Sequence, residues 1–352
     1  MTEFDLSTDG SRPLAAWPGS GTAIVGVVGF PVRHSLSPVL HNAALAALGI
    51  DWGYVAFEVP ETAFEAAVAG AVALGLRGLS VTMPHKDSAA RLATRRSRTV
   101  RRLGAANTLT FEPGAVLAES FDGRGLLDDL RSGVGFDPAG RRCGVIGSGG
   151  AGRSAVLALA EAGAAEIVIV NRTVASAWRS VALAPNIVRV GRPDELAGMD
   201  LVVQATPAAM GSPAQLEHED GPEQRGHSGK QDRGRVALKG EPAEGRPEVV
   251  AGVDPAWFGP GQVIFDVIYD PPLTPFLAAA AKRGATVRNG LGMLVSQAAL
   301  QIRLWTGLEA PLGVMWAAVG GDKAGVVDDA ALRAPAPGPG EGESTAQSYG
   351  VD

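Results

Sequence analysis

The sequence has a single cysteine, Cys143, among its 352 residues. One cysteine excludes an internal disulfide, so we expect the chain to work in a reducing cytoplasm. Cys143 lies in a predicted buried strand, which favours a packed thiol over a nucleophile. The chain also lacks an apolar run that could span a bilayer, and its N-terminus lacks the basic-then-apolar pattern of a signal peptide. We therefore predict a cytoplasmic protein with no membrane partner.

Positive charge is not in excess, because the formal net charge is −6. This balance argues against nucleic acid as a partner. One basic cluster stands out, and we interpret it as a solvated helix face: Arg95, Arg96, Arg98, Arg101 and Arg102. His218 and His227 lack the partners and spacing of a metal site, so we predict no metal.

A length of 352 residues with 46% hydrophobic residues suits two globular domains plus additional chain. The additional chain is polar or rich in Gly and Pro, and cannot bury enough apolar surface to fold alone. It comprises a disordered leader at 1–20, a disordered insertion at 212–248 and a disordered tail at 321–352. The remainder divides into a first domain at 21–125, a second domain at 126–290 and C-terminal helices at 291–320.

The second domain is organised around the stretch CGVIGSGGAGR, Cys143 to Arg153. A short apolar strand runs into Gly147-x-Gly149-x-x-Gly152, and a sequence of helical period follows. A second apolar strand, Ile167 to Val170, comes next. Such a glycine turn lets the backbone approach a pyrophosphate, which the helix N-terminus then stabilises. The pattern predicts a Rossmann-like dinucleotide-binding domain.

The residues after that second strand are Asn171-Arg172-Thr173, with no Asp or Glu among them. A carboxylate there would bind the ribose hydroxyls of NAD and repel a phosphate. An arginine followed by a hydroxyl suits the 2′-phosphate of NADP instead. We predict NADP, and a surface role for Arg172 with NAD as the cofactor stays the alternative.

The first domain alternates strands with helices, which predicts an α/β fold with mainly parallel strands. Ser35 and Ser37 lie at the mouth of a predicted helix and could cradle a carboxylate, and Ser37 before Pro38 is also a predicted N-cap. Lys86 and Asp122 are the candidate acid–base pair, able to move a proton while a hydride is transferred. The alternatives are a helix-surface lysine and an N-cap aspartate.

Several separate motifs, in the same order, together resemble the shikimate dehydrogenase family from about Ala23 to Trp305. Besides the glycine turn and Asn171-Arg172-Thr173, they are Gly29-x-Pro31-x-x-His34-Ser35-x-Ser37-Pro38, Val81-Thr82-x-Pro84-x-Lys86, Gly104-Ala105-x-Asn107-Thr108, Asp122-Gly123, Tyr269-x-Pro271-x-x-Thr274 and Gly290-Leu291-Gly292-Met293-Leu294-x-x-Gln297. The resemblance implies an N-terminal α/β substrate domain, a Rossmann-like NADP-binding domain and a C-terminal helix that returns to the first domain.

The implied reaction is the reversible, NADP-dependent reduction of 3-dehydroshikimate to shikimate, on the route to chorismate and the aromatic amino acids. Lys86 and Asp122 would bracket the reacting oxygen. The residues implied to hold the substrate are Ser35, Ser37, Thr82, Asn107, Tyr269 and Gln297. Those implied to line the cofactor are Gly147, Ser148, Gly149, Gly150, Ala151, Asn171, Arg172, Thr173, Val267 and Gly290.

The chain departs from the family pattern at four places. The usual Asn before the motif threonine is Ser80, the usual Asn-Thr before the aspartate is Ser120-Phe121, a usual second basic residue is Ser176, and a usual Asn is Gln204. A quinate or aminoshikimate-type dehydrogenase therefore stays open, because Phe121 would reshape the pocket. A non-catalytic ligand sensor is a further alternative, which loss of Lys86 or Asp122 would have favoured. A homodimer is compatible with the sequence, which does not decide the oligomeric state.

Overall fold

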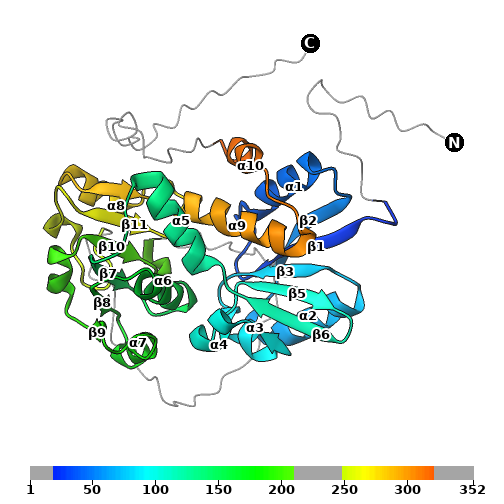
Figure 1. Cartoon of the computed structure of the whole chain (residues 1–352), viewed down its shortest axis with the longest axis horizontal. Coiled ribbons are helices and arrows are strands. Elements are labelled where there is room, and N and C mark those ends of the chain that lie inside the picture. The colour runs from blue at the N-terminus through cyan, green and yellow to red at the C-terminus, as the bar shows by residue number, and fades with distance from the viewer. Residues whose placement is uncertain (1–18, 210–247, 321–352) are drawn as a thin grey trace, which may run out of the picture.

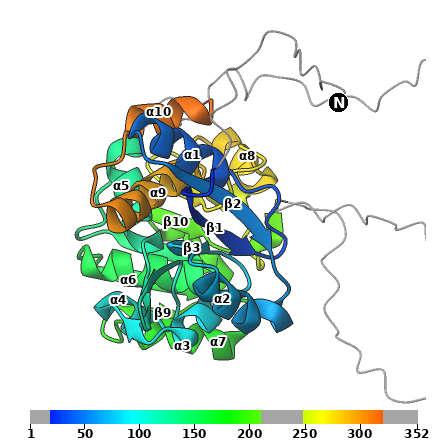
Figure 2. The same ribbon diagram turned by 90° about the vertical axis from the view of Figure 1, so that its right-hand side faces the viewer.

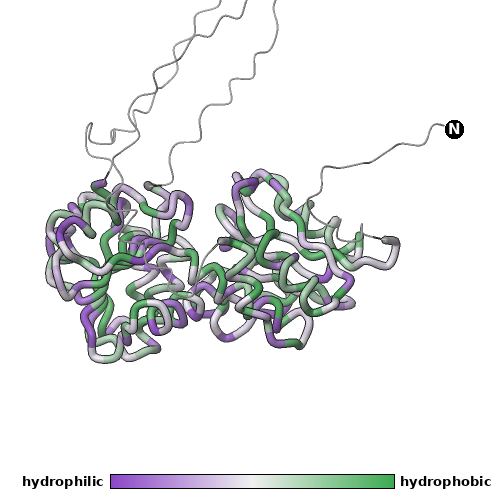
Figure 3. The backbone as a smooth tube through the Cα atoms, turned by 90° about the horizontal axis from the view of Figure 1, so that it is seen from above, coloured by the Kyte–Doolittle hydropathy of each residue, from purple (hydrophilic) through white to green (hydrophobic). Residues whose placement is uncertain are grey.

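The structure, a computed structural model, describes residues 19–209 and 248–320. The predicted leader, insertion and tail therefore lie almost entirely outside the described residues, as do His218 and His227. The described chain forms two lobes side by side, each built on a six-stranded sheet (Figure 1). Seen from above, hydrophobic segments run through the interior of both lobes (Figure 3). The α/β fold class is confirmed.

The first lobe contains a mixed sheet with the strand order β2-β1-β3-β5-β6-β4. Strand β1 pairs in parallel with β2 and β3, whereas β5 is antiparallel to both β3 and β6. Strands β5 and β6 form a hairpin because a tight turn joins them, where Gly114 has φ +75°. The strands are β1 Ala23–Gly29, β2 Trp52–Glu58, β3 Gly78–Val81, β4 Arg95–Arg96, β5 Thr108–Glu112 and β6 Ala115–Glu119. The helices are α1 Ser37–Ala47, η1 Glu61–Ala63, α2 Phe64–Ala73, α3 Lys86–Leu92 and α4 Arg98–Leu103.

The second lobe contains an entirely parallel sheet with the order β12-β11-β10-β7-β8-β9. Counted from the first strand of this sheet, this is the 3-2-1-4-5-6 order of dinucleotide-binding folds. The strands are β7 Arg142–Ile146, β8 Glu166–Val170, β9 Val188–Val190, β10 Leu201–Gln204, β11 Val263–Asp266 and β12 Thr286–Arg288. The helices are α6 Gly150–Glu161, α7 Val174–Val181 and α8 Pro275–Lys282, with short 3-10 turns η2 Pro193–Gly198, η3 Pro207–Ala209 and η4 Pro255–Trp257.

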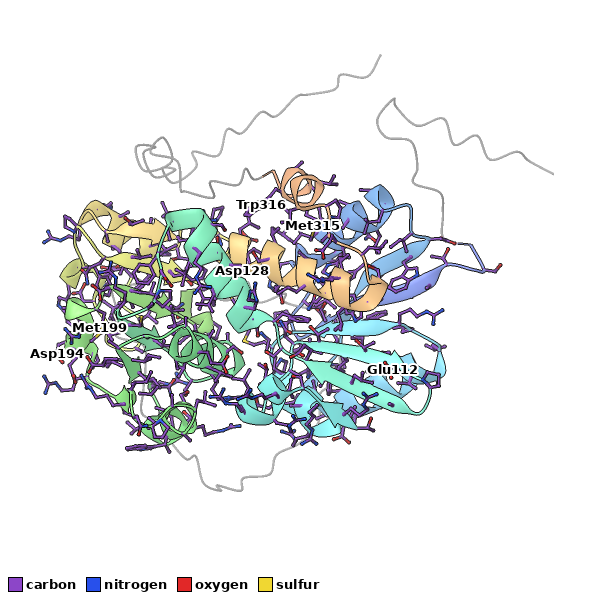
Figure 4. All side chains as sticks on the ribbon, in the orientation of Figure 1. Glu112, Asp128, Asp194, Met199, Met315 and Trp316 are labelled. Atoms are coloured by element: carbon purple, nitrogen blue, oxygen red, sulfur yellow. The ribbon has the colours of Figure 1, made fainter. Side chains whose placement is uncertain are left out.

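Two long helices, α5 Asp122–Val134 and α9 Leu291–Thr306, cross between the lobes and pack against each other (Figure 1). Helix α9 returns to the first lobe, where its apolar face enters the same core as Val25 and Leu40. Helix α10 Leu312–Ala318 then packs beside α1 (Figure 2) and directs Met315 and Trp316 toward this core (Figure 4). The predicted domain boundary after residue 125 falls inside α5 and stays a prediction.

A buried ion pair fixes the junction where α9 leaves the second lobe. Arg288, at the end of β12, donates from Nη2 to Asp129 Oδ1 of α5 at 2.5 Å, and both side chains are 1% exposed. A Cβ at Gly292 would overlap the Asp129 carboxylate, so glycine is required for this close approach. Burial raises the pKa of Asp129, and the guanidinium opposes that rise. The pair therefore ties both crossing helices to the edge of the second sheet.

Candidate active site

A cleft of about 650 Å³ lies between the lobes, at the carboxyl ends of β1 and β3 on one side and of β7, β10 and β11 on the other. Open α/β sheets bind ligands at this edge because loops and helix N-termini converge there. Every predicted site residue except Thr173 lines the cleft. Thr173 is exposed, and its backbone carbonyl accepts a hydrogen bond from Asn171 Nδ2.

Lys86 and Asp122 meet at the centre of this cleft. Lys86 is the first residue of α3 and Asp122 the first of α5, and Lys86 Nζ donates to Asp122 Oδ2 at 2.6 Å. Their side chains are 18% and 6% exposed, respectively. Lys86 is therefore not a surface lysine, and Asp122 is not a capping residue, because Phe121 holds the N-cap position without a side-chain bond.

Asn107 and Gln297 complete a polar cluster around this pair. Asn107 Nδ2 donates to Asp122 Oδ1 at 2.8 Å and to Gln297 Oε1 at 2.7 Å. Gln297 comes from α9, which approaches α5 so closely that a Cβ at Gly125 would meet Gln297. Segments far apart in the chain thus contribute one hydrogen-bonded group of side chains.

Ser35 and Ser37 lie at the start of α1, but the predicted cap is wrong. Helix α1 begins at Ser37 itself, its N-cap is Leu36, and no side chain caps it. Ser35 Oγ instead accepts from Ser37 N at 3.2 Å, so the earlier serine satisfies the free N–H. Tyr269 bonds to Ser35 from the other lobe, and burial raises the pKa of its hydroxyl, which keeps it a hydrogen-bond donor.

Close backbone packing shapes the glycine turn of the second lobe. Gly147 has φ +106°, and a Cβ there would meet the carbonyl of Ala205. A Cβ at Gly152 would overlap the carbonyl of Gly147, and one at Gly290 would overlap Val267. The open position is Gly149, the N-cap of α6, where a Cβ would meet nothing within 4 Å. The first N–H groups of α6 have no partner within the helix, so the turn fits a pyrophosphate.

The loop after β8 carries Arg172 to the rim of the cleft. Asn171 Nδ2 donates to Ser176 Oγ at 2.8 Å, which holds the loop on the first turn of α7. Arg172 is exposed and pairs with no carboxylate in the part of the chain that the structure describes. Its guanidinium is thus available to an external anion, and the fit extends to a phosphorylated ribose.

An ion pair across the lobes was missed by sequence reasoning. Arg153 of α6 is 3% exposed and bonds to the Asp87 carboxylate, to Leu103 O at 3.1 Å and to Ser148 O at 3.2 Å. Asp87 follows Lys86 directly, so this contact links the glycine turn to the helix that carries the lysine. The sequence offered one indication that Arg153 has a role, which is its position directly after the last glycine of the glycine motif.

The departures from the family pattern differ in their proximity to the cleft. Ser80 lines it, whereas Phe121 is absent from the lining residues, so the expectation that Phe121 reshapes the pocket is wrong. Gln204 is buried under the cleft and accepts from Thr206 N at 2.5 Å.

Within residues 19–209 and 248–320, no group of three or more His, Cys, Asp and Glu side chains is placed to hold a metal, and no helix is both long and apolar enough to cross a membrane.

Comparison with known proteins supplies the family. Residues 27–109 match the shikimate dehydrogenase substrate binding domain, and residues 290–319 match the shikimate 5'-dehydrogenase C-terminal domain. The chain is 38% identical over 308 residues to the NADP(+) shikimate dehydrogenase of Methanopyrus kandleri, covering 85% of this chain and 95% of the relative. It is 39% identical over 294 residues to that of Citrifermentans bemidjiense, covering 84% and 93%.

Solved structures agree with this assignment. The shikimate 5-dehydrogenase of Thermus thermophilus, in complex with NADP(H) and shikimate, superposes with a TM-score of 0.68 at 29% identity. The match covers 85% of this chain and 99% of that one. The chain belongs to the shikimate dehydrogenase family.

Proposed function

We propose that this protein catalyses the reversible, NADP-dependent reduction of 3-dehydroshikimate to shikimate. The observation that carries the proposal is the Lys86–Asp122 pair, held at 2.6 Å in the same cleft as the glycine turn. A proton-transfer pair next to a dinucleotide cradle is what reduction of a carbonyl to an alcohol requires. Relatives that match most of the chain carry the name shikimate dehydrogenase (NADP(+)).

The ring substrate binds to the first lobe. The hydroxyls of Ser35 and Ser37, with Tyr269 opposite, hold the ring carboxylate by hydrogen bonds at the start of α1. Thr82, Asn107 and Gln297 hold the ring hydroxyls, because their amide and hydroxyl groups converge on the same side of the cleft.

The proton moves at Lys86 Nζ. In the reductive direction the ammonium donates its proton to the substrate oxygen, and in the oxidative direction the amine accepts it. Asp122, 6% exposed and bonded to Asn107, keeps the lysine side chain directed at that oxygen. When bound, NADPH supplies the hydride, and NADP⁺ accepts it in the reverse direction.

The second lobe holds the cofactor. Gly147 to Ala151 line the side of the cleft that takes its pyrophosphate, and Gly290 and Val267 line the side that takes its nicotinamide half. Asn171 and Thr173 shape the loop that presents Arg172 to the 2′-phosphate. Since Ser176 is not basic, Arg172 reads this phosphate alone in that loop.

The cell compartment and the pathway follow from this activity. A small-molecule enzyme with one buried cysteine and no disulfide suits the cytoplasm. There its product supplies the synthesis of chorismate and the aromatic amino acids, and its partners are the ring acid and the cofactor.

A steady-state panel tests the proposal, with shikimate, quinate and aminoshikimate each assayed against NADP⁺ and NAD⁺. We expect the highest kcat/KM for shikimate with NADP⁺. A higher kcat/KM for quinate or aminoshikimate would identify that acid as the substrate instead of shikimate. If none of the three acids is turned over, the proposed function is wrong.

A further inference from the structure

A continuous chain of hydrogen bonds begins behind the cleft, at Tyr54 on β2. The Tyr54 hydroxyl donates to Ser80 Oγ at 2.7 Å. Ser80 Oγ donates to Gln301 Oε1 at 2.8 Å, which carries the chain from the sheet to helix α9. Gln301 lies one helical turn after Gln297 and therefore on the same face of α9.

The chain then returns to the sheet and ends at the acid–base pair. Gln301 Nε2 donates to Thr108 Oγ1 at 2.9 Å, and Thr108 Oγ1 donates to Asn107 Oδ1 at 2.9 Å. Asn107 Nδ2 donates to Asp122 Oδ1 at 2.8 Å. In each hydrogen bond the acceptor lies on the side nearer to the Asp122 carboxylate, so each bond polarises the next in the same direction.

All of these side chains are buried, and their polar atoms are consequently expensive to leave without partners. Gln301 and Thr108 are 0% exposed, and Asn107 is 2% exposed. Gln301 does not line the cleft, so it cannot contact the substrate. Gln301 belongs to α9 and bonds to Ser80 of β3 and to Thr108 of β5. Any effect of Gln301 on the site therefore passes through these neighbours.

The effect of the chain converges on the amide of Asn107. Its Oδ1 accepts from two donors, Thr108 Oγ1 and Phe121 N, the latter at 3.0 Å. A flipped amide would place its NH₂ group against both donors. The NH₂ group must therefore face Asp122 and Gln297, where it supplies a donor to the carboxylate.

We propose that Gln301 and Thr108 are positioning residues that, through Asn107, hold the Asp122 side chain oriented toward Lys86. Lys86 is the charged group bonded to Asp122 among the described residues, and the chain adds a neutral donor from the opposite side. The inference rests on the proposed function in one respect only, that the Lys86–Asp122 pair moves the proton.

Two measurements test it. The side-chain amide of Asn107 is observed by ¹⁵N NMR in the protein without cofactor, and kcat is measured with shikimate and NADP⁺. The variants are Thr108→Val, which removes the hydroxyl at constant shape, and Gln301→Leu. Thr108→Ser keeps the hydroxyl. Gln262→Leu is the matched control, since it removes a glutamine with three comparable hydrogen bonds far from the cleft.

Without the Thr108 hydroxyl the Asn107 amide loses one of the two donors that fix its orientation, and Asp122 then loses the donor that holds it toward Lys86. We expect Thr108→Val to shift the Asn107 side-chain amide resonances and to lower kcat by roughly three- to tenfold, the range of one hydrogen bond. Gln301→Leu should give a smaller change in the same direction. Thr108→Ser and Gln262→Leu should match the wild type.

The proposal is overturned if a folded Thr108→Val protein leaves the Asn107 amide resonances and kcat as in the wild type. It is also overturned if Thr108→Ser changes them equally, because packing would then be the cause. A wild-type chain that fails to turn over shikimate overturns the proposed function instead. In that case the NMR measurement still decides whether the chain of hydrogen bonds fixes the Asn107 amide.

Discussion

The two lobes present different kinds of group to the cleft. In the first lobe the polar side chains Lys86, Asp122 and Asn107 are bonded to one another at 2.6 Å and 2.8 Å. In the second lobe the lining combines the glycine turn with small and apolar residues, and Arg172 is exposed in the loop after β8. One side is fixed by side-chain contacts before a ligand arrives, and the other offers space and N–H groups.

This difference reflects what each side must do. Proton transfer needs atoms held within hydrogen-bond distance and in one orientation, which a buried polar network provides. Phosphates are recognised by backbone N–H groups and helix N-termini, which need open space above the chain more than fixed side chains. The contact between Arg153 and Asp87 joins the two sides. The following changes break or sharpen this comparison, from the largest expected effect to the smallest.

The largest effect should come from Lys86→Ala. Removing the ammonium should lower turnover by roughly 10²–10⁴-fold, the usual weight of general acid–base catalysis. The KM for NADP⁺ should barely change, because the cofactor binds to the other lobe. Steady-state kinetics with shikimate measures both quantities.

Two further variants at this pair serve as checks. Asp122→Asn should impair the same step, since the amide cannot hold the ammonium as a carboxylate does. Lys86→Arg should not restore turnover, because a guanidinium stays protonated and accepts no proton in the oxidative direction. Near-normal turnover of Lys86→Ala on every ring acid tried would show that Lys86 does not transfer the proton.

Lowering the pH should change the contributions of two buried groups, one in each lobe, to the free energy of unfolding in opposite directions. In the first lobe His41 is buried against Tyr54, and burial lowers its pKa to about 4. Between pH 6.5 and about 4 the unfolded state therefore binds the extra proton, so stability falls with falling pH, by up to about 3 kcal/mol. In the second lobe burial raises the pKa of Asp266 from 3.8 to about 6, so the folded state binds the proton and stability rises over that range as pH falls.

Urea unfolding between pH 4 and 7 separates the two contributions. His41→Phe, which keeps a stacked ring, should make the free energy of unfolding less sensitive to acid than in the wild type. Asp266→Asn should make it more sensitive. If both variants lose stability with acid as the wild type does, neither His41 nor Asp266 contributes to the pH dependence of the free energy of unfolding.

The cofactor side should depend on Arg172. Arg172→Ala should raise the KM for NADP⁺ about ten- to a hundredfold relative to that for NAD⁺, the weight of about 1.5–3 kcal/mol for a charge-assisted bond. Turnover at saturating NADP⁺ should stay near that of the wild type. An equal rise for both cofactors would show that Arg172 does not read the phosphate.

The smallest effect should come from Gly150→Ala, which tests how closely the lobes approach. A Cβ at Gly150 would lie 3.0 Å from Lys86 Cδ, so the lysine side chain must shift slightly. Overpacking against a flexible chain should lower turnover roughly fivefold, about 1 kcal/mol. Gly313→Ala in α10, where a Cβ has open space, is the control.

The core of the second lobe could be predicted from the sequence. Parallel strands buried on both faces appear as short apolar runs, and the strand predicted from Ile167 to Val170 became β8, which starts one residue earlier. The pairing of Lys86 with Asp122 could be suspected because both follow strand ends, though their distance could not be known.

Contacts between distant segments were beyond reach from one sequence. The bond between Ser80 and Gln301 joins positions 221 residues apart, and that between Arg153 and Asp87 joins positions 66 apart. Neither follows from propensity or spacing, since each depends on how helices cross after folding. The cap predicted at Ser37 failed for a local reason, because the helix starts one residue earlier and Ser37 is its first residue, with its own N–H bonded to Ser35 Oγ.

The return of α9 has a consequence for the protein during its synthesis. The strands of the second sheet all lie between Arg142 and Arg288, so that lobe can close once this stretch has left the ribosome. The first lobe begins at Ala23 but needs Leu294, Val295 and Ile302 of α9 to fill its core. The N-terminal segment therefore emerges first and completes its packing last. Until α9 emerges, the nascent chain also lacks Gln297, so the polar cluster around Lys86 and Asp122 stays incomplete while the protein is being made.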